Sequence, residues 1–408
     1  MGRGYEVERE PEGTLPGRLR KTGKSVYLVS AEPSGDQLSV GLIRELRDRA
    51  PDLHVHAIGG DAVRREGFTS AIPTEPLAVL GFVEGLKALP VVNDLAMRAV
   101  QDIVAKRPDA VVLIDSWGFS IRVAKLLKLN GLSTHIVKYV APQVWAMRRG
   151  RAKVLARFVD NLLCLYPFDA PFFTRHGLPT TVVGHPVLDT DHSAGDGPGF
   201  RKRHRISRLD PLLLVAFGSR AAEVDRLTEA FVETIRILKA KRPGLAIVSP
   251  IVPATAARLT AKLATMGLNG IEIIGVDEDE KLDAFAASDF AIAKSGTITT
   301  QLADAGVPTV VAYKVNGLTY HAAKWLMKAD YITIANVVAD TALMPEFIQH
   351  EVVPERMAEV LDGWLDDPRQ AASLSEALRA VASRMRGGHE NGGANARAAA
   401  AVLDVLSG

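Results

Sequence analysis

Short apolar runs alternate with amphipathic stretches along most of this 408-residue chain, and the alternation is interrupted once. The first series begins with Ser25–Ser30, 54–59 and 110–115, and a second series begins with 212–217. Apolar runs of this length, separated by segments of helical periodicity, are typical of parallel strands joined by helices. The sequence therefore predicts two doubly wound, Rossmann-like α/β domains that face each other across a cleft, followed by C-terminal helices.

Changes in composition give the expected boundaries of these domains. Residues 191–208 carry turn formers and charge with little apolar content, which is typical of a linker. We therefore predict a disordered tail at 1–24, an N-terminal domain at 25–190, a linker at 191–208, a second domain at 209–350 and C-terminal helices at 351–408.

Charge and cysteine content exclude several classes of protein. With 49 Lys and Arg against 47 Asp and Glu, the net charge of +2 gives no broad electrostatic basis for nucleic-acid binding. The single cysteine, Cys164, excludes an internal disulfide and a Cys-rich zinc site, and its apolar surroundings favour a buried hydrophobe over a nucleophile. We find no run of about 18 uncharged apolar residues and no secretory signal, so we expect a cytoplasmic protein without a membrane span.

Two turns of the second domain have the composition of phosphate-binding loops. In open α/β sheets, ligands bind where the carboxyl ends of strands lead into helices. Gly218-Ser219-Arg220 combines close backbone approach, a hydroxyl and a bidentate cation at the start of a predicted helix, although it is also an ordinary capped turn. Ser295-Gly296-Thr297 repeats the pattern, and Gln301 follows in the next helix, either to bind ribose hydroxyls or to lie in solvent. We find no Asp/His grouping with metal-ligand spacing, and a diphosphate held in this way needs no metal.

The first domain has acidic residues at the corresponding places. Glu32, Ser34, Gly35 and Asp36 form its first turn, where carboxylates suit sugar hydroxyls, or where Asp36 caps a helix. This turn lacks the glycine fingerprint of a dinucleotide site, which disfavours an NAD(P)-dependent oxidoreductase. Asp115 ends an apolar strand and is placed to act as a general base; a helix cap or a structural hydrogen bond is an equally good interpretation.

One connection and one basic cluster suggest contact with lipid. The segment 73–90 is more apolar than one helical face requires, so it is either a membrane or acyl-chain contact or part of the core. Its candidate contact residues are Leu77, Val79, Leu80, Phe82, Val83 and Leu86. The cluster Arg148, Arg149, Arg151 and Lys153 either binds anionic headgroups or is a solvated face.

Taken in order, these segments resemble the lipid-A-disaccharide synthase family, which are inverting glycosyltransferases of the two-Rossmann-domain (GT-B) architecture. The similarity runs from about Ser25 to the C-terminus. It is carried by Glu32-Pro-Ser-Gly-Asp36, Gly59-Gly60, Leu77-Ala-Val-Leu-Gly81, Ile114-Asp115, Tyr139-Val-Ala-Pro-Gln-Val-Trp-Ala146, Pro167-Phe168, Val183-Gly-His-Pro186, Gly218-Ser-Arg220, Ser295-Gly-Thr297 and Asn336.

The resemblance implies a reaction and its partners. A cofactor-free and metal-free enzyme would transfer 2,3-diacylglucosamine from its UDP donor to 2,3-diacylglucosamine 1-phosphate, forming a β-1,6 linkage. Asp115 would be the general base, and Gln301 and Asn336 would join the two phosphate-binding turns in holding the nucleotide sugar. Glu32, Ser34 and Asp36 would be residues of the cleft. The lipid substrates imply peripheral attachment to the inner face of the inner membrane, and the family suggests a homodimer.

Several positions depart from the family pattern. Gln301 replaces a glutamate, Gly118 a second acid, Lys138 a histidine and Phe217 a proline. These departures keep two alternatives open: a paralogous GT-B glycosyltransferase for another nucleotide sugar or lipid acceptor, and a catalytically inactive protein that binds lipid or nucleotide.

Overall fold

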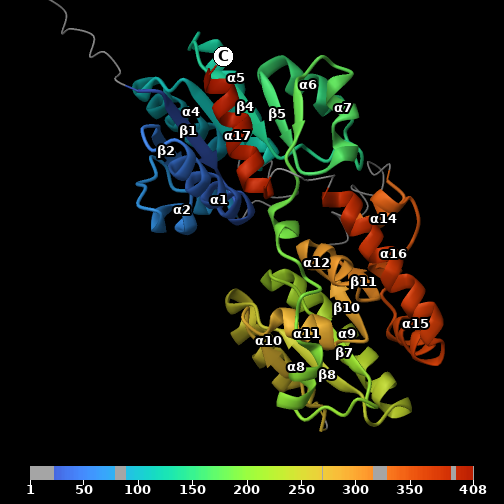
Figure 1. The fold of residues 1–408 in the computed structure, drawn as a ribbon. Helices are drawn as coiled ribbons and strands as arrows, with labels where there is room; N and C mark the ends of the chain where they lie inside the picture. Colours follow the sequence, from blue (N-terminus) through green and yellow to red (C-terminus); the bar gives the residue numbers. More distant parts are fainter. Residues whose placement is uncertain (1–22, 79–88, 269, 316–328, 387–391, 408) are drawn as a thin grey trace, which may run out of the picture.

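The computed structural model describes residues 23–78, 89–268, 270–315, 329–386 and 392–407. They form two lobes, each built on a parallel six-stranded sheet (Figure 1). The predicted pair of doubly wound α/β domains is confirmed.

The first sheet has the strand order β2-β1-β3-β4-β5-β6. Successive residues of β1 point to opposite faces, and both faces are buried: Val26 and Leu28 pack on the side of α1, and Tyr27 and Val29 on the side of α4. Helices on both faces explain why the strands read as continuous apolar runs. The elements are β1 (Ser25–Ser30), α1 (Pro33–Arg49), β2 (His54–Ile58), α2 (Asp61–Arg65), α3 (Glu75–Ala78), α4 (Leu89–Lys106), β3 (Ala110–Ile114), α5 (Trp117–Leu129), β4 (His135–Tyr139), α6 (Gly150–Phe158), β5 (Asn161–Cys164), η1 (Pro167–Asp169), α7 (Pro171–Thr174) and β6 (Thr180–Val182).

The second sheet has the order β12-β11-β10-β7-β8-β9. The sequence does not predict β12, which is only three residues long and starts directly after Pro345. The elements are η2 (Pro186–Asp189), α8 (Gly197–Arg203), β7 (Leu212–Ala216), α9 (Ala221–Lys241), β8 (Ala246–Pro250), α10 (Pro253–Met266), β9 (Ile274–Val276), α11 (Lys281–Ala287), β10 (Phe290–Lys294), α12 (Thr297–Ala305), β11 (Thr309–Tyr313), α14 (Ile334–Ala339), β12 (Glu346–Ile348), η3 (Gln349–Glu351), α15 (Pro354–Asp366), α16 (Pro368–Arg386) and α17 (Ala394–Ser407).

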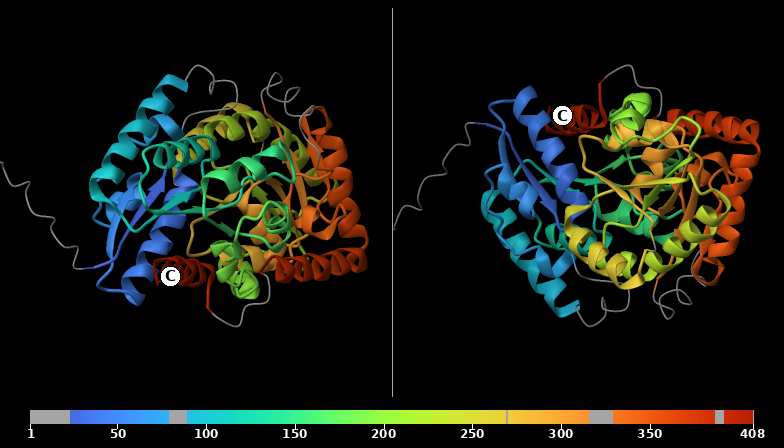
Figure 2. Two further views of the ribbon diagram at one scale, coloured as in Figure 1. Left: turned by 90° about the horizontal axis from the view of Figure 1, so that it is seen from above. Right: turned by 90° about the horizontal axis from the view of Figure 1, so that it is seen from below.

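Two segments cross between the lobes, and the first contains more structure than the sequence indicates. The segment 191–208 includes α8, whose Phe200 is fully buried in a cluster with Phe285 of α11. The C-terminal helices divide between the lobes, because α15 and α16 pack on the second lobe whereas α17 returns to α1 (Figure 2). Gly41 allows this close approach, since a Cβ atom there would lie 2.5 Å from the side chain of Asn395.

A buried carboxylate ties both crossings to α12. Asp304 accepts a hydrogen bond from the backbone N–H of His192 (3.1 Å), and His192 Nδ1 lies 2.8 Å from the same oxygen. From the other crossing, the Arg386 guanidinium at the end of α16 donates to Asp304 at 2.7 Å. The side chains of His192 and Asp304 are only 2% and 3% exposed. This cluster holds together two stretches of chain that are almost 200 residues apart.

We expect Asp304→Ala to destabilise the protein by about 1–3 kcal/mol, because it leaves the buried His192 without its acceptor and the half-buried Arg386 without its partner. Urea unfolding followed by circular dichroism measures this. The control is Glu359→Ala, on the exposed face of α15, which should change stability by less than about 0.5 kcal/mol. An unfolding midpoint for Asp304→Ala equal to that of the control would contradict a clamping role.

Candidate active site

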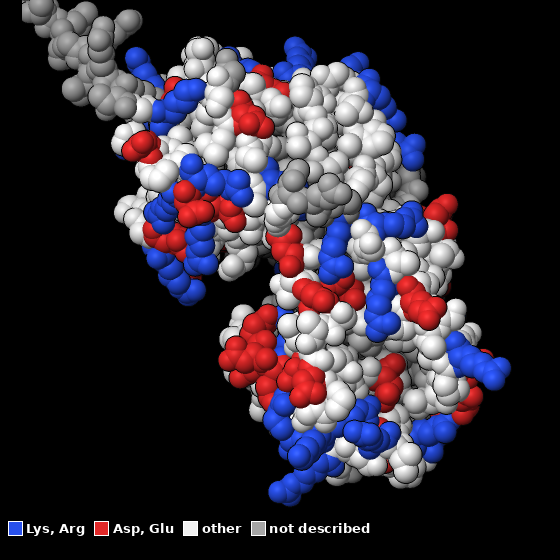
Figure 3. Space-filling view, in the orientation of Figure 1, with Lys and Arg blue, Asp and Glu red and all other residues white. Residues whose placement is uncertain are grey.

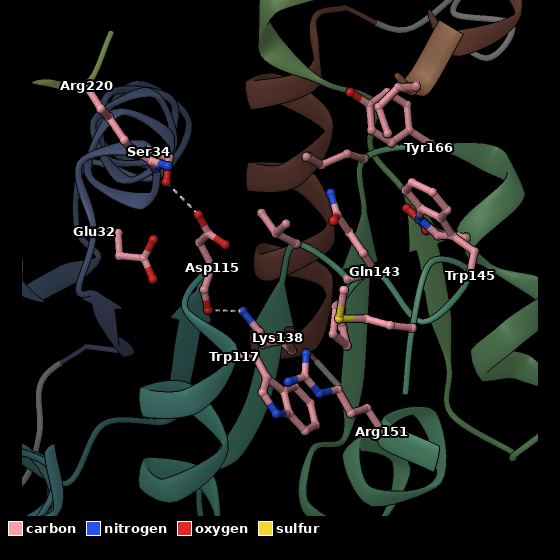
Figure 4. A pocket seen from close by; sticks show the side chains of 17 residues that line it. Glu32, Ser34, Asp115, Trp117, Lys138, Gln143, Trp145, Arg151, Tyr166 and Arg220 are labelled. Atoms are coloured by element: carbon pink, nitrogen blue, oxygen red, sulfur yellow. Dashed lines mark hydrogen bonds between the residues drawn. The ribbon is translucent and has the colours of Figure 1, made fainter. Parts of the chain in front are cut away.

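A cleft of about 490 Å³ opens between the lobes, at the carboxyl ends of the first sheet's strands. The space-filling view shows a notch between the upper and lower lobes, with positive and negative side chains interspersed on this face (Figure 3). Glu32, Ser34 and Asp115 line the cleft from the first lobe, and Arg220 and Ile334 line it from the second. The close-up shows Asp115 between Glu32 and Lys138, with Arg220 beyond Ser34 (Figure 4).

Asp115 directly follows β3 and has an unusual backbone conformation. Its φ angle is +51° and that of Ser116 is +38°, a left-handed region that residues other than glycine rarely adopt. The Ser34 hydroxyl donates to Asp115 Oδ2 at 2.7 Å. Gly35 permits this contact, because a Cβ atom there would lie 3.3 Å from the Cβ of Asp115. The turn and the N-terminus of α1 together aim the carboxylate into the cleft.

Lys138 holds the turn in place from inside the sheet. Its side chain is fully buried, and its ammonium donates to the carbonyls of Leu113 (3.2 Å), Asp115 (2.5 Å) and Tyr139 (3.0 Å). Burial lowers the pKa of Lys138 to about 8, while the charges of Asp115 and Glu32 act in the opposite direction. This departure from the family's histidine therefore supports the Asp115 backbone, and its three donors are directed at carbonyl groups.

Glu32 is a half-buried carboxyl group on the same side of the cleft. Burial, followed by the neighbouring charge of Asp115, raises the pKa of Glu32. A hydrogen bond with Ser116 and the positive charges of Arg220 and Lys138 oppose that rise in pKa. Arg220 of the second lobe is therefore close enough to stabilise the acidic wall of the first lobe.

Asp36, predicted as a residue of the cleft, lies outside it. The carboxylate is 5% exposed and accepts hydrogen bonds from Ser30 Oγ (2.9 Å) and from the backbone N–H groups of Gly60 (2.7 Å) and Ala62 (3.1 Å). It therefore caps α2 and fixes the loop after β2. Of the four residues predicted in the first turn, Glu32 and Ser34 line the cleft. Gly35 and Asp36 are buried next to it and support the turn.

The two predicted phosphate-binding turns of the second domain lie side by side, because β7 pairs with β10. The backbone N–H groups of Ser219 and Arg220 both donate to Glu223 Oε2 (3.0 and 3.2 Å), so they are not available to a phosphate. Gly218 has a φ angle of +118°, and a Cβ atom there would lie 2.7 Å from the Cβ of Glu223. Lys294 pairs with the other oxygen of Glu223 at 2.8 Å and links the two turns. The Arg220 side chain is what this turn presents to the cleft.

The second turn leaves a helix N-terminus accessible. Gly296 and Thr297 are exposed, and the N-cap residue of α12, Gly296, has no side chain with which to cap the helix. Thr299 donates from its hydroxyl to the Gly296 carbonyl (2.6 Å), which fixes the turn. Ser295 and Gln301 are half-buried, and neither is among the residues that line the cleft.

Asn336, predicted to help hold the nucleotide sugar, lies in the interior. It is 0% exposed, and its amide bonds the carbonyl of Met344 (2.7 Å), the N–H of Met344 (2.8 Å) and Glu346 Oε1 (2.9 Å). These contacts use most of the hydrogen-bonding capacity of the amide. Asn336 therefore joins α14 to β12, and the sequence motif did not reveal this.

The predicted lipid-contact segment is described only at its edge. Leu77 is 5% exposed and packs in the core of the first domain, so the core interpretation holds for this residue. Val79, Leu80, Phe82, Val83 and Leu86 lie outside the described residues.

Within the described part of the chain, no helix combines the length and apolar character that crossing a bilayer requires. Among the same residues, no three His, Cys, Asp or Glu side chains gather as metal ligands.

Sequence reasoning missed the far wall of the cleft, which the segments after β4 and β5 supply. Tyr166 stacks on Phe168 at 5.6 Å, and Trp145 meets the edge of Phe168 at 5.8 Å. Burial raises the pKa of Tyr166, and Thr300 of α12 in the other lobe acts against that rise. Asp169 also lines the cleft, and burial raises its pKa to about 7. The signal was the same as for Asp115, namely a polar residue shortly after the carboxyl end of a parallel strand.

The raised pKa of Asp169 predicts a pH-dependent stability. The folded state favours the protonated carboxyl, so this group's stabilising contribution is present below pH 4 and is lost as the pH rises towards 7. Asp169→Asn stays neutral, so its stability relative to the wild type should increase from pH 5 to pH 8 by an amount on the order of a few kcal/mol. Urea midpoints at the two pH values test this, with Glu359→Gln as a control that should show no such change. An equal difference at both pH values would argue against a neutral, buried Asp169.

Comparison with known proteins shows which family this chain matches. The family model of lipid-A-disaccharide synthetases matches residues 26–393. The chain is 39% identical to the lipid-A-disaccharide synthase of Paramagnetospirillum magneticum, over 93% of this chain and 97% of that protein. It is 36% identical to the one of Ruegeria pomeroyi, over 98% and 100% of the two chains.

Solved structures share the fold at low sequence identity. A UDP co-structure of S. aureus MnaA has a TM-score of 0.62 at 12% identity, covering 94% of this chain and 98% of that one. MurG of Acinetobacter baumannii has a TM-score of 0.56 at 15% identity, covering 94% and 99%. These likenesses agree with the two-lobed architecture described above.

Proposed function

Because this chain belongs to the lipid-A-disaccharide synthetase family, we propose that its cleft joins two acylated glucosamines. The chain is a glycosyltransferase that transfers 2,3-diacylglucosamine from UDP to 2,3-diacylglucosamine 1-phosphate, which yields a β-1,6-linked disaccharide and UDP. The observation that carries the proposal is the position of Asp115, whose carboxylate lines the cleft between the lobes and faces Arg220 of the second lobe.

Asp115 is the general base of this reaction. Ser34 holds Oδ2, so Oδ1 is the atom left to receive the proton of the acceptor's 6-hydroxyl. As this proton moves to Asp115, the hydroxyl oxygen forms a bond to the anomeric carbon of the donor. The bond from that carbon to the β-phosphate oxygen breaks, and its electron pair leaves with UDP. A single displacement of this kind inverts the anomeric configuration.

The second lobe stabilises the departing diphosphate. Arg220 faces the cleft with a planar, permanently charged guanidinium that suits phosphate oxygens. The uncapped start of α12 at Ser295-Gly296-Thr297 lies on the neighbouring strand and adds the positive end of a helix dipole. Both features act where negative charge develops in the transition state, and neither requires a metal.

The lipid substrates lead us to propose a cytoplasmic enzyme attached peripherally to the inner face of the inner membrane. The acceptor's and donor's acyl chains would then remain in or near the bilayer while their sugars occupy the cleft. Residues 79–88 are the proposed contact with the membrane, and a homodimer is proposed from the family alone.

Asp115→Asn should lower kcat by about 10²- to 10⁴-fold, because the amide cannot accept the proton. The affinity for UDP, measured by calorimetry, should stay within about twofold, since Arg220 and α12 are untouched. Asp52→Asn, on an exposed turn of the same domain, is the matched control. Turnover of Asp115→Asn at the control's rate would remove Asp115 from the role of base.

Arg220→Ala should weaken UDP binding by about 10- to 100-fold, the range expected for losing charge-assisted hydrogen bonds. Arg369→Ala removes the same charge from an exposed position at the start of α16 and should bind UDP as the wild type does. Calorimetric titration with UDP distinguishes the two variants. Equal affinities would mean that the diphosphate is held elsewhere.

A further inference from the structure

A second arginine, Arg151, lines the cleft on the side away from Arg220 (Figure 4). It lies in the first turn of α6, and its guanidinium carbon is 5.1 Å from the centre of the Trp117 ring at the start of α5. Stacking on an aromatic face fixes the plane of a guanidinium and leaves its N–H groups free to bond at the edge. Arg151 is thus half-buried, oriented and directed into the same cavity as Asp115.

No carboxylate of the described residues pairs with Arg151, although it is partly removed from water. Many other arginines here have such a partner; for example, Arg201 pairs with Asp289 and Arg386 with Asp304, each at 2.7–2.8 Å. Burial and then the neighbouring charge of Arg148 lower the pKa of Arg151 to about 10. Arg151 is therefore a half-buried charge at the cleft wall without the counter-ion that partly buried charges usually have.

The position of Arg151 on its helix adds to this positive potential. The N-terminus of a helix carries the positive end of the dipole and favours acidic residues. The first turn of α6 has no acidic residue and carries Arg151 instead. A bound anion would be favoured by the helix end and the guanidinium together. These features point to a phosphate-sized anion at this end of the cleft.

We propose that Arg151, stacked on Trp117, binds the phosphate monoester of the acceptor sugar. This inference rests on the proposed function, in which the acceptor carries a phosphate at C1 and reacts through its 6-hydroxyl. With the hydroxyl at Asp115, the phosphate extends away from Arg220, so the two anionic groups of the reaction are held by different arginines at opposite ends of the cleft. That separation limits the repulsion between the acceptor phosphate and the donor diphosphate.

The test compares two acceptors, diacylglucosamine 1-phosphate and the same lipid without its phosphate, in neutral detergent micelles. Arg151→Ala should raise KM for the phosphorylated acceptor by about 10- to 100-fold and leave KM for the other acceptor and for the UDP donor unchanged. Arg151→Lys should recover part of the loss, because lysine restores the charge and lacks the planar fork. Equal effects on both acceptors, or no effect, would overturn the inference.

A neighbouring variant separates the acceptor phosphate from the headgroups of membrane lipids. Arg149→Ala removes the same charge two residues away, at an exposed side chain that does not line the cleft. It should leave discrimination between the two acceptors as in the wild type. If Arg149→Ala and Arg151→Ala instead weaken binding to phosphatidylglycerol vesicles alike, with discrimination unchanged, Arg151 belongs to a membrane contact and the inference fails.

Calorimetric binding of the two acceptors distinguishes failure of this inference from failure of the proposed function. Binding that prefers the phosphorylated acceptor through Arg151, without sugar transfer, would overturn the proposed function and uphold the anion site. Sugar transfer with no dependence on Arg151 would have the opposite meaning.

Discussion

The geometry of the candidate active site depends on a buried ammonium group. Lys138 donates to carbonyls at the ends of β3 and β4, and one of these belongs to Asp115, whose backbone is left-handed. Without these donors, three carbonyls would lie in the sheet interior with fewer partners, and the turn would lose its main support. The desolvation that lowers the pKa of Lys138 is the cost of this arrangement. The buried ammonium of Lys138 thus helps to orient the Asp115 carboxylate without having to contact the substrate.

The charges of the cleft are arranged in an order that matches the proposed reaction. Arg220 lies at one end and Arg151 at the other, with the carboxylates of Glu32 and Asp115 on the wall near Arg220 (Figure 4). The acidic groups occupy the place where neutral hydroxyls are expected to react, and the arginines occupy the places of the phosphates. A chain with a net charge of only +2 can bind two anionic substrates because its charges are separated locally.

The sequence predicts which residues meet at the cleft better than it predicts what each one contacts. Parallel topology brings residues after β1, β3 and β7 to facing edges, so Glu32, Asp115 and Arg220 could be expected together. Hydrogen-bond partners are set by tertiary packing that no local pattern records. Asp36 and Asn336 match family motifs, yet the side chains of both form hydrogen bonds with backbone groups of neighbouring loops.

The residues that link the lobes lie close to those that bind substrate, which connects domain geometry to catalysis. The C-terminal residues of α12 carry Asp304, the clamp of both chain crossings, while its uncapped N-terminus forms part of the proposed diphosphate site. Thr300, between them, is close enough to Tyr166 on the opposite wall of the cleft to lower its pKa. The clamp that joins the two crossings and the proposed diphosphate site therefore belong to one nine-residue helix, α12. The base is held separately, by Ser34 and Lys138 of the first lobe, so the two halves of the proposed site are built on different sheets.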